Sequence, residues 1–375
     1  MKFCLGLGLV DKNILYIIVG GLIYFFMTLY LGEIVISNIF DHSLVMNLAS
    51  SLGLMLSFIP TVIYKIKNKE MKCCKCCKKD LRNNLVYNDY YKNIRCGKYK
   101  LIILSSLIDF TQSIIIDAFI KINEIFMFEF ELLFISLFSF IIFKSKLYLH
   151  HYLSIISIIC VNISLDIYLS NFNFNNFDKV ISMILKFISE ILLSLVFVID
   201  KYIMEKKFSS PYELCFFHGI INFILGLICL SFSREIGLDN YEEFFLNPSF
   251  EKFWAFIIIM LSQFIINLFI LIINKNTSPC HIIIILIIGQ FAPYVRALTI
   301  DTKNSIILII GLSILFFLTL IFNEIIEIKC FGLQKNTKKN IALRAEMDRL
   351  SIDNIYSEID TNGEDEEDNK TINDI

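Results

Sequence analysis

Long, uninterrupted apolar runs dominate the sequence, as in KLIILSSLIDF (residues 100–110) and HIIIILIIG (residues 281–289). These runs lack the alternation of apolar and polar residues that marks the strands of a membrane barrel. A bilayer core about 30 Å thick is crossed by roughly 20 helical residues, and peptide groups in lipid must find their hydrogen-bond partners within the helix. The pattern predicts an all-α polytopic membrane protein with ten transmembrane helices, near residues 13–34, 44–65, 100–119, 123–143, 147–169, 179–201, 212–233, 252–274, 279–298 and 304–326.

Two of these ten segments depart from a purely apolar pattern. The second contains Asn47 and Pro60, and the fourth contains Glu129 and Glu131. The first segment lacks a small-residue cleavage site and is long enough to cross a bilayer. We therefore interpret it as a retained helix and not as a signal peptide.

The polar connections between the segments differ in charge from one predicted face of the membrane to the other. The connection 66–99 is densely basic, whereas 170–178 and 233–251 are neutral or acidic. Further lysines follow the fourth, sixth and tenth segments: Lys144, Lys146, Lys201, Lys206, Lys207, Lys329, Lys335, Lys338 and Lys339. Because cytoplasmic loops collect Lys and Arg, the pattern predicts an even number of spans with both termini in the cytosol.

Ten spans divide into two sets of five with opposite orientations, which is an inverted repeat. Many secondary transporters use such repeats and bind their substrate at the midplane between the halves. We infer the repeat from the number of spans, not from sequence identity between the halves. The predicted parts are a cytosolic N-terminus, a first repeat with a basic Cys-rich cytosolic loop, a second repeat, and a cytosolic tail with an acidic, disordered end: residues 1–12, 13–169 with loop 66–99, 179–326 and 327–375.

Composition supports lipid as part of the solvent, because 56% of the residues are hydrophobic and only 19% are charged. No Gly-rich nucleotide-binding loop is visible, so ATP-driven pumping is not expected. No catalytic set of His, Ser and Asp is visible either, and we predict neither an enzyme nor a cofactor. A metal site and a nucleic-acid partner are not predicted, and adjacent His150 and His151 are interpreted as interface residues.

Polar side chains inside the predicted spans are the candidates for a substrate site. An ionisable group at bilayer depth costs at least about 2.5 kcal/mol, so it usually faces a cavity or a partner. Asp109 is the best-placed acid, because Gln112 lies on the same helical face at i+3. The predicted substrate-binding residues are Asp109, Gln112, Glu129, Glu131, Glu190, Asn267 and Gln290.

Each of these acids also has a purely structural interpretation. Lys186 and Glu190 are spaced i,i+4 and can neutralise each other. Glu129 and Glu131 lie about 200° apart on a helix, so they cannot both face one cavity. A phosphate-bearing solute such as a nucleotide sugar needs cations or helix N-termini, whereas an acidic cavity suits cations, amines or proton coupling.

Two local motifs leave alternatives open. The segment from Gly289 to Pro293 can break its helix and free carbonyls to line a cavity, or it can form a Pro kink without a ligand, which we favour. The cluster Cys73, Cys74, Cys76 and Cys77 stands among lysines beside a span. It suits S-palmitoylation or has no role, and these two interpretations rank equally; zinc binding ranks third, because no second Cys pair or His lies at finger spacing.

Several segments together resemble the drug/metabolite transporter superfamily, in its solute carrier family 35 and nucleotide-sugar-transporter-like branch. Residues 134–155 resemble the fourth and fifth helices of that branch, and residues 187–226, which include a Ser-Pro element, resemble its sixth and seventh helices. Residues 278–293 and 323–341 look like the ninth helix and the exit after the tenth. The resemblance covers roughly residues 100–340 and implies ten helices, inverted repeats and alternating access.

The sequence departs from that family pattern in the fourth helix. Related members often carry a Gln-Met-x-Arg-Gly-like element there, whereas residues 125–131 read IFMFEFE, with an aromatic in place of the Arg and two acids. The substrate range of the family is therefore not carried over.

These observations lead to one main function and one alternative. We expect a secondary-active transporter of a small solute, a multi-pass protein of the endomembranes (Golgi, endosome or lysosome) whose partners are a small-molecule substrate and the lipid bilayer. A homodimer is left open. The alternative is a non-transporting scaffold, a receptor-like protein or a membrane-embedded enzyme.

Overall fold

The computed structural model describes ten stretches of the chain: residues 3–4, 9–10, 12–38, 43–71, 85–121, 130–170, 177–207, 209–236, 250–298 and 302–326. Within them, two two-residue strands form an antiparallel pair in which Phe3 faces Val10, and all other secondary-structure elements are helical. The elements are β1 (Phe3–Cys4), β2 (Leu9–Val10), α1 (Lys12–Asn38), α2 (Ser43–Met55), α3 (Phe58–Met71), α4 (Leu85–Lys121), α5 (Glu131–Phe143), α6 (Leu149–Ser170), α7 (Phe177–Lys206), α8 (Pro211–Ile236), α10 (Phe250–Asn276), the short 3₁₀ helix η2 (Pro279–His281), α11 (Ile282–Ala297) and α12 (Thr302–Phe322).

Seven helical segments are long and apolar enough to cross a membrane: Leu44–Tyr64, Gly97–Ile116, Val180–Lys206, Pro211–Phe232, Phe250–Asn276, Pro279–Arg296 and Ser305–Phe322. They coincide with seven of the ten predicted spans. The other three predicted spans coincide with shorter apolar helical segments, Ile14–Leu29, Glu131–Phe143 and Leu149–Leu165. The prediction of an α-helical membrane protein is therefore confirmed.

Large apolar side chains on the outside of the bundle fit this membrane assignment. Phe26, Ile59 and Ile141 are each more than 60% exposed, and similar residues recur on most of the long helices. Contiguous exposed apolar surface of this kind is rare on water-soluble proteins. In lipid the same side chains are in their preferred solvent.

The second predicted span is broken into α2 and α3 at residues 56–57. Pro60 has no N–H to donate to the preceding turn, and the backbone there forms tighter bonds, in which the Leu56 N–H donates to Gly53 O at 3.0 Å and the Ser57 N–H donates to Leu54 O at 3.1 Å. Ser57 Oγ donates to Leu54 O at 2.6 Å, and Thr61 Oγ1 donates to Ser57 O at 2.7 Å. The chain therefore continues as a second helix beyond a short turn.

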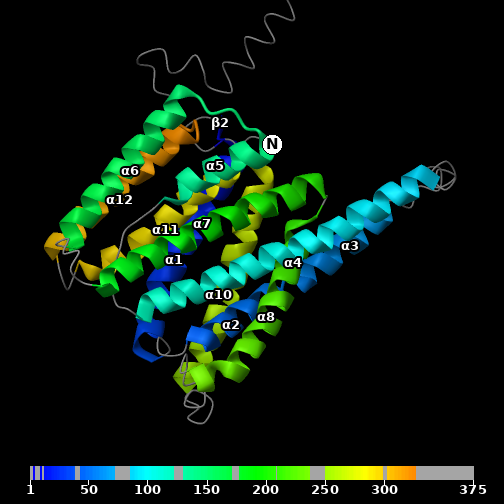
Figure 1. Cartoon of the computed structure of the whole chain (residues 1–375), viewed down its shortest axis with the longest axis horizontal. Coiled ribbons are helices and arrows are strands. Elements are labelled where there is room, and N and C mark those ends of the chain that lie inside the picture. Colours follow the sequence, from blue (N-terminus) through cyan, green and yellow to red (C-terminus); the bar gives the residue numbers. More distant parts are fainter. Residues whose placement is uncertain are drawn as a thin grey trace, which may run out of the picture.

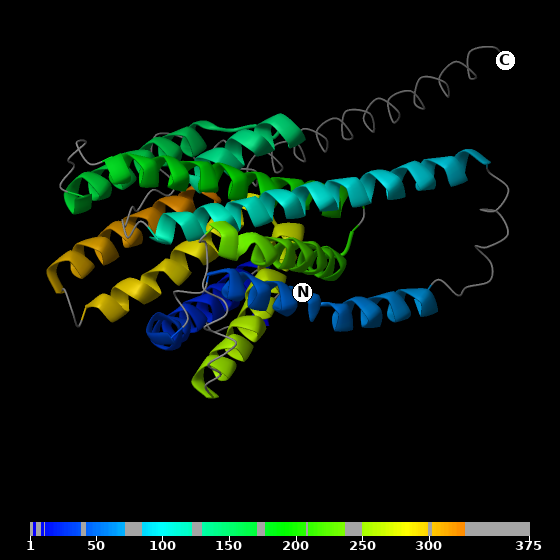
Figure 2. The ribbon, with the colours of Figure 1, turned by 60° about the horizontal axis from the view of Figure 1, so that its bottom comes forward.

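The helices pack as a bundle from which α3 and the first part of α4 extend to one side (Figures 1 and 2). Within the bundle α1 packs on α10 and α11, α2 packs on α8 and α10, and α4 packs on α7 and α8. Helix α5 packs on α7, and α12 packs on α6 and α11. Sequence neighbours are thus often separated, and most of the close pairs join the two halves of the chain.

Two glycines allow helix α2 to approach its neighbours closely. A Cβ at Gly53 would collide with the backbone carbonyl of Met260 in α10. A Cβ at Gly219 in α8 would lie 2.7 Å from the Met55 backbone nitrogen in α2. Small residues at such crossings are the usual means by which membrane helices come into contact.

Candidate functional site

A polar cavity of about 350 Å³ lies among seven helices in the centre of the bundle. Helices α1, α2 and α4 line it from the first half of the chain, and α7, α8, α10 and α11 line it from the second half. Its described lining combines ten apolar or aromatic side chains with thirteen polar ones, so it is more polar than the usual site for a small molecule. The polar lining residues are Tyr24, Asn47, Ser50, Ser51, Asp109, Gln112, Ser113, Asp200, Cys215, His218, Asn222, Gln263 and Asn267.

Asp109 is held in this cavity by an amide from another helix. Its Oδ2 accepts a hydrogen bond from Asn222 Nδ2 in α8 at 2.7 Å. The Asn222 side chain is buried, with 7% of its surface exposed, and its Oδ1 has no hydrogen-bond partner within the described residues. The pair therefore fixes one carboxylate oxygen and leaves one amide acceptor available to a ligand.

A second acid, Asp200 in α7, forms a separate cluster on the same cavity. Its Oδ1 accepts a hydrogen bond from Ser105 Oγ in α4 at 2.6 Å. The same oxygen lies 3.4 Å from His218 Nε2 in α8, which is ion-pair distance when the imidazole is protonated. Three helices are thus joined through one buried carboxylate.

Three of the predicted substrate residues, Asp109, Gln112 and Asn267, are brought together by the fold at this cavity. Gln112 Nε2 donates to Ser189 Oγ in α7 at 3.3 Å. Asn267 Nδ2 donates within its own helix to Gln263 Oε1 at 3.0 Å. The i,i+3 spacing of Asp109 and Gln112 in the sequence therefore correctly predicts a shared face.

Glu190 and Glu131 lie away from the cavity, where α5 begins beside α7. Glu190 Oε2 accepts the backbone N–H of Phe130 at 2.8 Å, and Lys186 Nζ lies 3.3 Å from Glu190 Oε1. The predicted i,i+4 pairing of Lys186 and Glu190 is confirmed. Glu131, the first residue of α5, is also buried. In this arrangement Glu190 joins the start of α5 to α7.

Gln290 belongs to α11 and is not among the residues that line the central cavity. Helix α11 runs without interruption from Ile282 to Ala297 and contains Pro293. The continuous helix agrees with the interpretation of this segment that involves no break. Two other predictions, the substrate role of Glu129 and the lipidation of Cys73, Cys74, Cys76 and Cys77, concern residues outside the described stretches.

Sequence reasoning missed the cavity residues Asp200, His218 and Asn222. Asp200 stands at the end of a predicted span, next to Lys201, where a charge is expected at the membrane surface. His218 and Asn222 are spaced i,i+4, which places both on one face of α8. That spacing was the available signal, but their acidic partners come from α4 and α7, which only the tertiary structure identifies.

Lys201 also differs from its prediction. It was expected in a charged connection between spans, but its side chain is buried. It is 5% exposed, and its Nζ donates to three backbone carbonyls at the end of α10, those of Asn274, Lys275 and Thr277, at 2.7, 2.9 and 2.8 Å. Its ammonium group also lies 2.9 Å from Glu205 Oε1. The last carbonyls of a helix lack intrahelical partners, so Lys201 caps α10.

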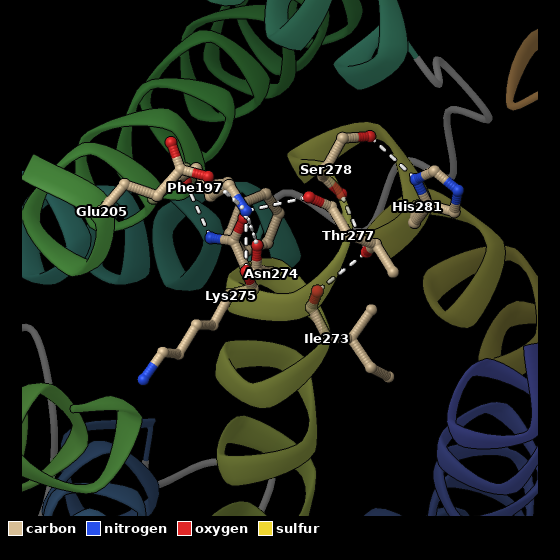
Figure 3. A network of polar contacts seen from close by, with 9 residues as sticks. Phe197, Glu205, Ile273, Asn274, Lys275, Thr277, Ser278 and His281 are labelled. Atoms are coloured by element: carbon tan, nitrogen blue, oxygen red, sulfur yellow. Dashed lines mark hydrogen bonds and ion pairs between the residues drawn. The ribbon is translucent and has the colours of Figure 1, made fainter. Parts of the chain in front are cut away.

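A second tie joins the same two helices. Asn274 Nδ2 donates to Phe197 O in α7 at 2.8 Å, and Figure 3 shows the residues of this network between α7 and the end of α10. Beyond them Ser278 Oγ lies 2.8 Å from His281 Nδ1 in the turn that begins the next helix. The end of α10 is therefore fixed to α7 by side chains from both.

A larger cavity of about 480 Å³ opens beside this network. It is lined by residues of three connections, 144–148, 277–281 and 323–324, and by Lys201 and Glu205 of α7. These connections follow α5, α10 and α12. The helix ends that were predicted to share one face of the membrane thus lie together.

Three ionisable side chains meet at the edge of that cavity. His150 Nε2 and His151 Nε2 lie 3.3 and 3.8 Å from Glu324 Oε1, and the three groups are close enough to hold a metal ion. However, the backbone N–H of Tyr148 donates to His151 Nδ1 at 3.0 Å. With Nδ1 as an acceptor, the neutral ring carries its proton on Nε2, which opposes metal binding through that nitrogen and suits contact with the Glu324 carboxylate.

No protein-family model matches the sequence, and no curated protein matches it. The class of the protein is therefore defined by its architecture. The long apolar helices identify an α-helical membrane protein of the multi-pass kind, with a polar cavity enclosed by its helices.

Proposed function

We propose that this chain is a secondary-active transporter that carries a small solute across a membrane by alternating access. The observation that carries the proposal is the central cavity, which helices from both halves of the chain line together. A binding site between two halves is the arrangement that secondary transporters use. Transport needs no covalent chemistry, so the proposal includes no enzymatic activity, cofactor or metal.

The packing of the helices supports ten spans in two repeats. The proposed spans are the seven long apolar segments and the three shorter ones in α1, α5 and α6. We match each helix of the first half with one of the second half: α1 with α7, α2 with α8, α4 with α10, α5 with α11 and α6 with α12. When matched helices are exchanged, several observed helix contacts become other observed contacts. Pair α1/α11 becomes α7/α5, α4/α7 becomes α10/α1, and α2/α10 becomes α8/α4.

Two further contacts, α2/α8 and α6/α12, join helices that are matched with each other. The exchange leaves these contacts unchanged, as expected for helices beside a twofold axis. The contact of α11 with α12 has no equally extensive counterpart between α5 and α6. The cavity follows the same relation, because α1 and α7, α2 and α8, and α4 and α10 all contribute to its lining. An inverted repeat accounts for these correspondences without detectable sequence identity.

The proposed orientation places both termini and the larger cavity in the cytosol. The connection 144–148 and the exit after α12 lie at that cavity, and both are predicted to be cytosolic from their lysines. The resemblance to the solute carrier family 35 branch agrees with this topology and with an endomembrane location. A homodimer remains an alternative to a monomer.

Counterflow in liposomes tests the proposal. The purified chain is reconstituted into vesicles that are preloaded with unlabelled solute, and uptake of the labelled solute is followed for putrescine, choline, methylphenylpyridinium, glutamate and UDP-glucose. We expect at least one solute to exchange, and Asp109→Asn to reduce the exchange at least about tenfold.

Thr111→Val provides the matched control. Thr111 lies two residues further along α4 at an exposed position, and within the described residues its hydroxyl bonds the Leu107 carbonyl of its own helix. We expect this variant to exchange solute at the rate of the unmodified chain. Folded protein that exchanges no solute would contradict the proposal and favour a receptor-like or scaffolding role for the same cavity.

A further inference from the structure

We infer that the central cavity binds a cation, namely an amine or quaternary ammonium group carried on a small apolar body. The inference rests on the proposed function in one respect: it takes the bound cation to be the transported solute. The charge preference of the cavity is a property of its walls and can be measured without transport.

The ionisable residues of the cavity favour positive charge. Asp109 and Asp200 contribute two negative charges when ionised, and His218 neutralises at most one of them. No Lys or Arg is among the described residues that line the cavity. An anionic solute would therefore meet like charge without a compensating Lys or Arg, whereas an ammonium group would find two carboxyl groups in the lining.

The hydrogen-bonding groups favour a ligand that donates. An ionised carboxylate only accepts hydrogen bonds, so the Asn222 amide must turn its Nδ2 toward Asp109, and its Oδ1 is left as an acceptor. This oxygen is buried and makes no hydrogen bond within the described part of the chain. The N–H of an amine satisfies a buried acceptor of this kind, which is unfavourable to leave unsatisfied. A quaternary ammonium group has no N–H, so this observation favours an amine.

The remaining walls suit the body of an organic cation. Tyr24, Phe110 and Phe197 are aromatic residues of the lining, and Leu54 and Leu286 are aliphatic ones. Aromatic faces attract cations once water is excluded. A cavity of about 350 Å³ is at the small end of the range for ligand sites, which limits the solute to a small molecule.

Thiol labelling measures the charge preference directly. The eleven native cysteines are replaced, and Ser50, which lines the cavity from α2, is changed to Cys. The labelling rates with a trimethylammonium-bearing and a sulfonate-bearing methanethiosulfonate are then compared. We expect the cation-to-anion rate ratio to exceed that of a free thiol in solution at least about tenfold, because a cavity with walls of one charge concentrates the opposite charge.

Substitutions identify the source of this ratio. Asp109→Asn and Asp200→Asn should each lower it at least about threefold. Glu251→Gln should leave it unchanged, because Glu251 is exposed at the start of α10 and does not line the cavity. A ratio equal to that of a free thiol, or one that neither Asp substitution lowers, would overturn the inference.

Direct binding to the unmodified chain keeps the inference testable if the cysteine-free chain does not fold. Equilibrium binding of labelled putrescine, choline, methylphenylpyridinium and UDP-glucose is measured on the purified full-length protein. We expect at least one of the three cations to bind, to lose at least about tenfold in affinity in Asp200→Asn, and to bind more tightly than UDP-glucose.

The two proposals fail in different ways. Counterflow of UDP-glucose without binding of any cation would leave the carrier function standing and overturn the cation inference. Cation-selective labelling and binding without counterflow of any solute would leave the cation site standing and contradict transport. If none of the three cations binds, that result alone overturns the cation inference.

Discussion

At the residue scale, buried polar groups in this bundle divide into those that hold helices together and those that face the cavity. Lys201 and Glu190 belong to the first kind, since each satisfies backbone groups of a neighbouring helix. Asp109, Asp200 and Asn222 also bond neighbouring helices, and they form the second kind because they line the central cavity as well. Removal of the two kinds should therefore have different consequences.

Lys201→Met is predicted to destabilise the fold. It leaves the carbonyls of Asn274, Lys275 and Thr277 without their shared donor, which costs about 1–3 kcal/mol for a buried unsatisfied group. Thermal unfolding of the purified chain in detergent, followed by intrinsic fluorescence, should show a lower midpoint. Lys206→Met, at an exposed position on the same helix, is the control and should unfold like the unmodified chain.

Glu190 is predicted to act on stability and not on solute binding. Glu190→Gln retains an acceptor for the Phe130 N–H, whereas Glu190→Ala loses it, so the alanine variant should be less stable by about 1–3 kcal/mol. Both variants should bind the transported solute with unchanged affinity in a saturation assay. A large loss of affinity in Glu190→Gln at normal stability would instead restore Glu190 as a substrate residue.

Part of the candidate site could be predicted from the sequence, namely the part formed by residues that are close together along the chain. Asp109 and Gln112 share a face because of helical periodicity, which one sequence reveals. The contact of Asp109 with Asn222 spans 113 positions, and that of Asp200 with Ser105 spans 95. No local pattern encodes such contacts, so the second acid and its histidine partner were not predicted.

At the element scale, apolar length predicted the helices well and their interruptions less well. Pro60 was visible in the sequence, but the turn at residues 56–57 is formed by backbone hydrogen bonds between residues three apart, and the Ser57 and Thr61 hydroxyls add bonds to nearby carbonyls. The close crossings of α2 with α8 and α10 were also not predictable, because a glycine at a helix contact looks the same in the sequence as any other glycine.

Alanine at these crossings is predicted to be harmful although it is a good helix former. Gly53→Ala and Gly219→Ala place a methyl group against backbone atoms that cannot move aside, and overpacking of this kind costs about 1–3 kcal/mol. Gly20→Ala is the matched control, because a Cβ there meets only side-chain ends at 3.4–3.5 Å. Size-exclusion profiles and unfolding midpoints of the three variants should separate the first two from the third.

At the scale of the whole molecule, the proposed topology threads the helices alternately through a bilayer. Ser145, Thr277 and Asn323 line one cavity, so the connections after α5, α10 and α12 lie at the same end of the bundle. Charge along the sequence predicted that the connections after α5 and α12 share one side, and the alternation of spans added the connection after α10. The pairing of helices between the two halves emerged only from their packing.

Single cysteines at Ser145 and Thr277 are predicted to react from the cytosolic side alone. Cells with a selectively permeabilised plasma membrane are treated with a membrane-impermeant thiol reagent, and labelling is scored before and after full solubilisation. A cysteine at Phe250, the exposed first residue of α10, should react only after solubilisation. Labelling of Ser145→Cys and Thr277→Cys from opposite sides would rule out the proposed topology.

Alternating access requires that the cavity between the two halves opens to each side of the membrane in turn. Labelling of Ser50→Cys from the two sides tests this requirement most directly. In sealed proteoliposomes of defined orientation, an impermeant cationic methanethiosulfonate is supplied either outside or inside. The account predicts that the cysteine reacts from each side when that side alone is exposed to reagent. Reaction from one side only, whatever solute is present, would contradict a carrier and indicate a fixed, one-sided binding pocket.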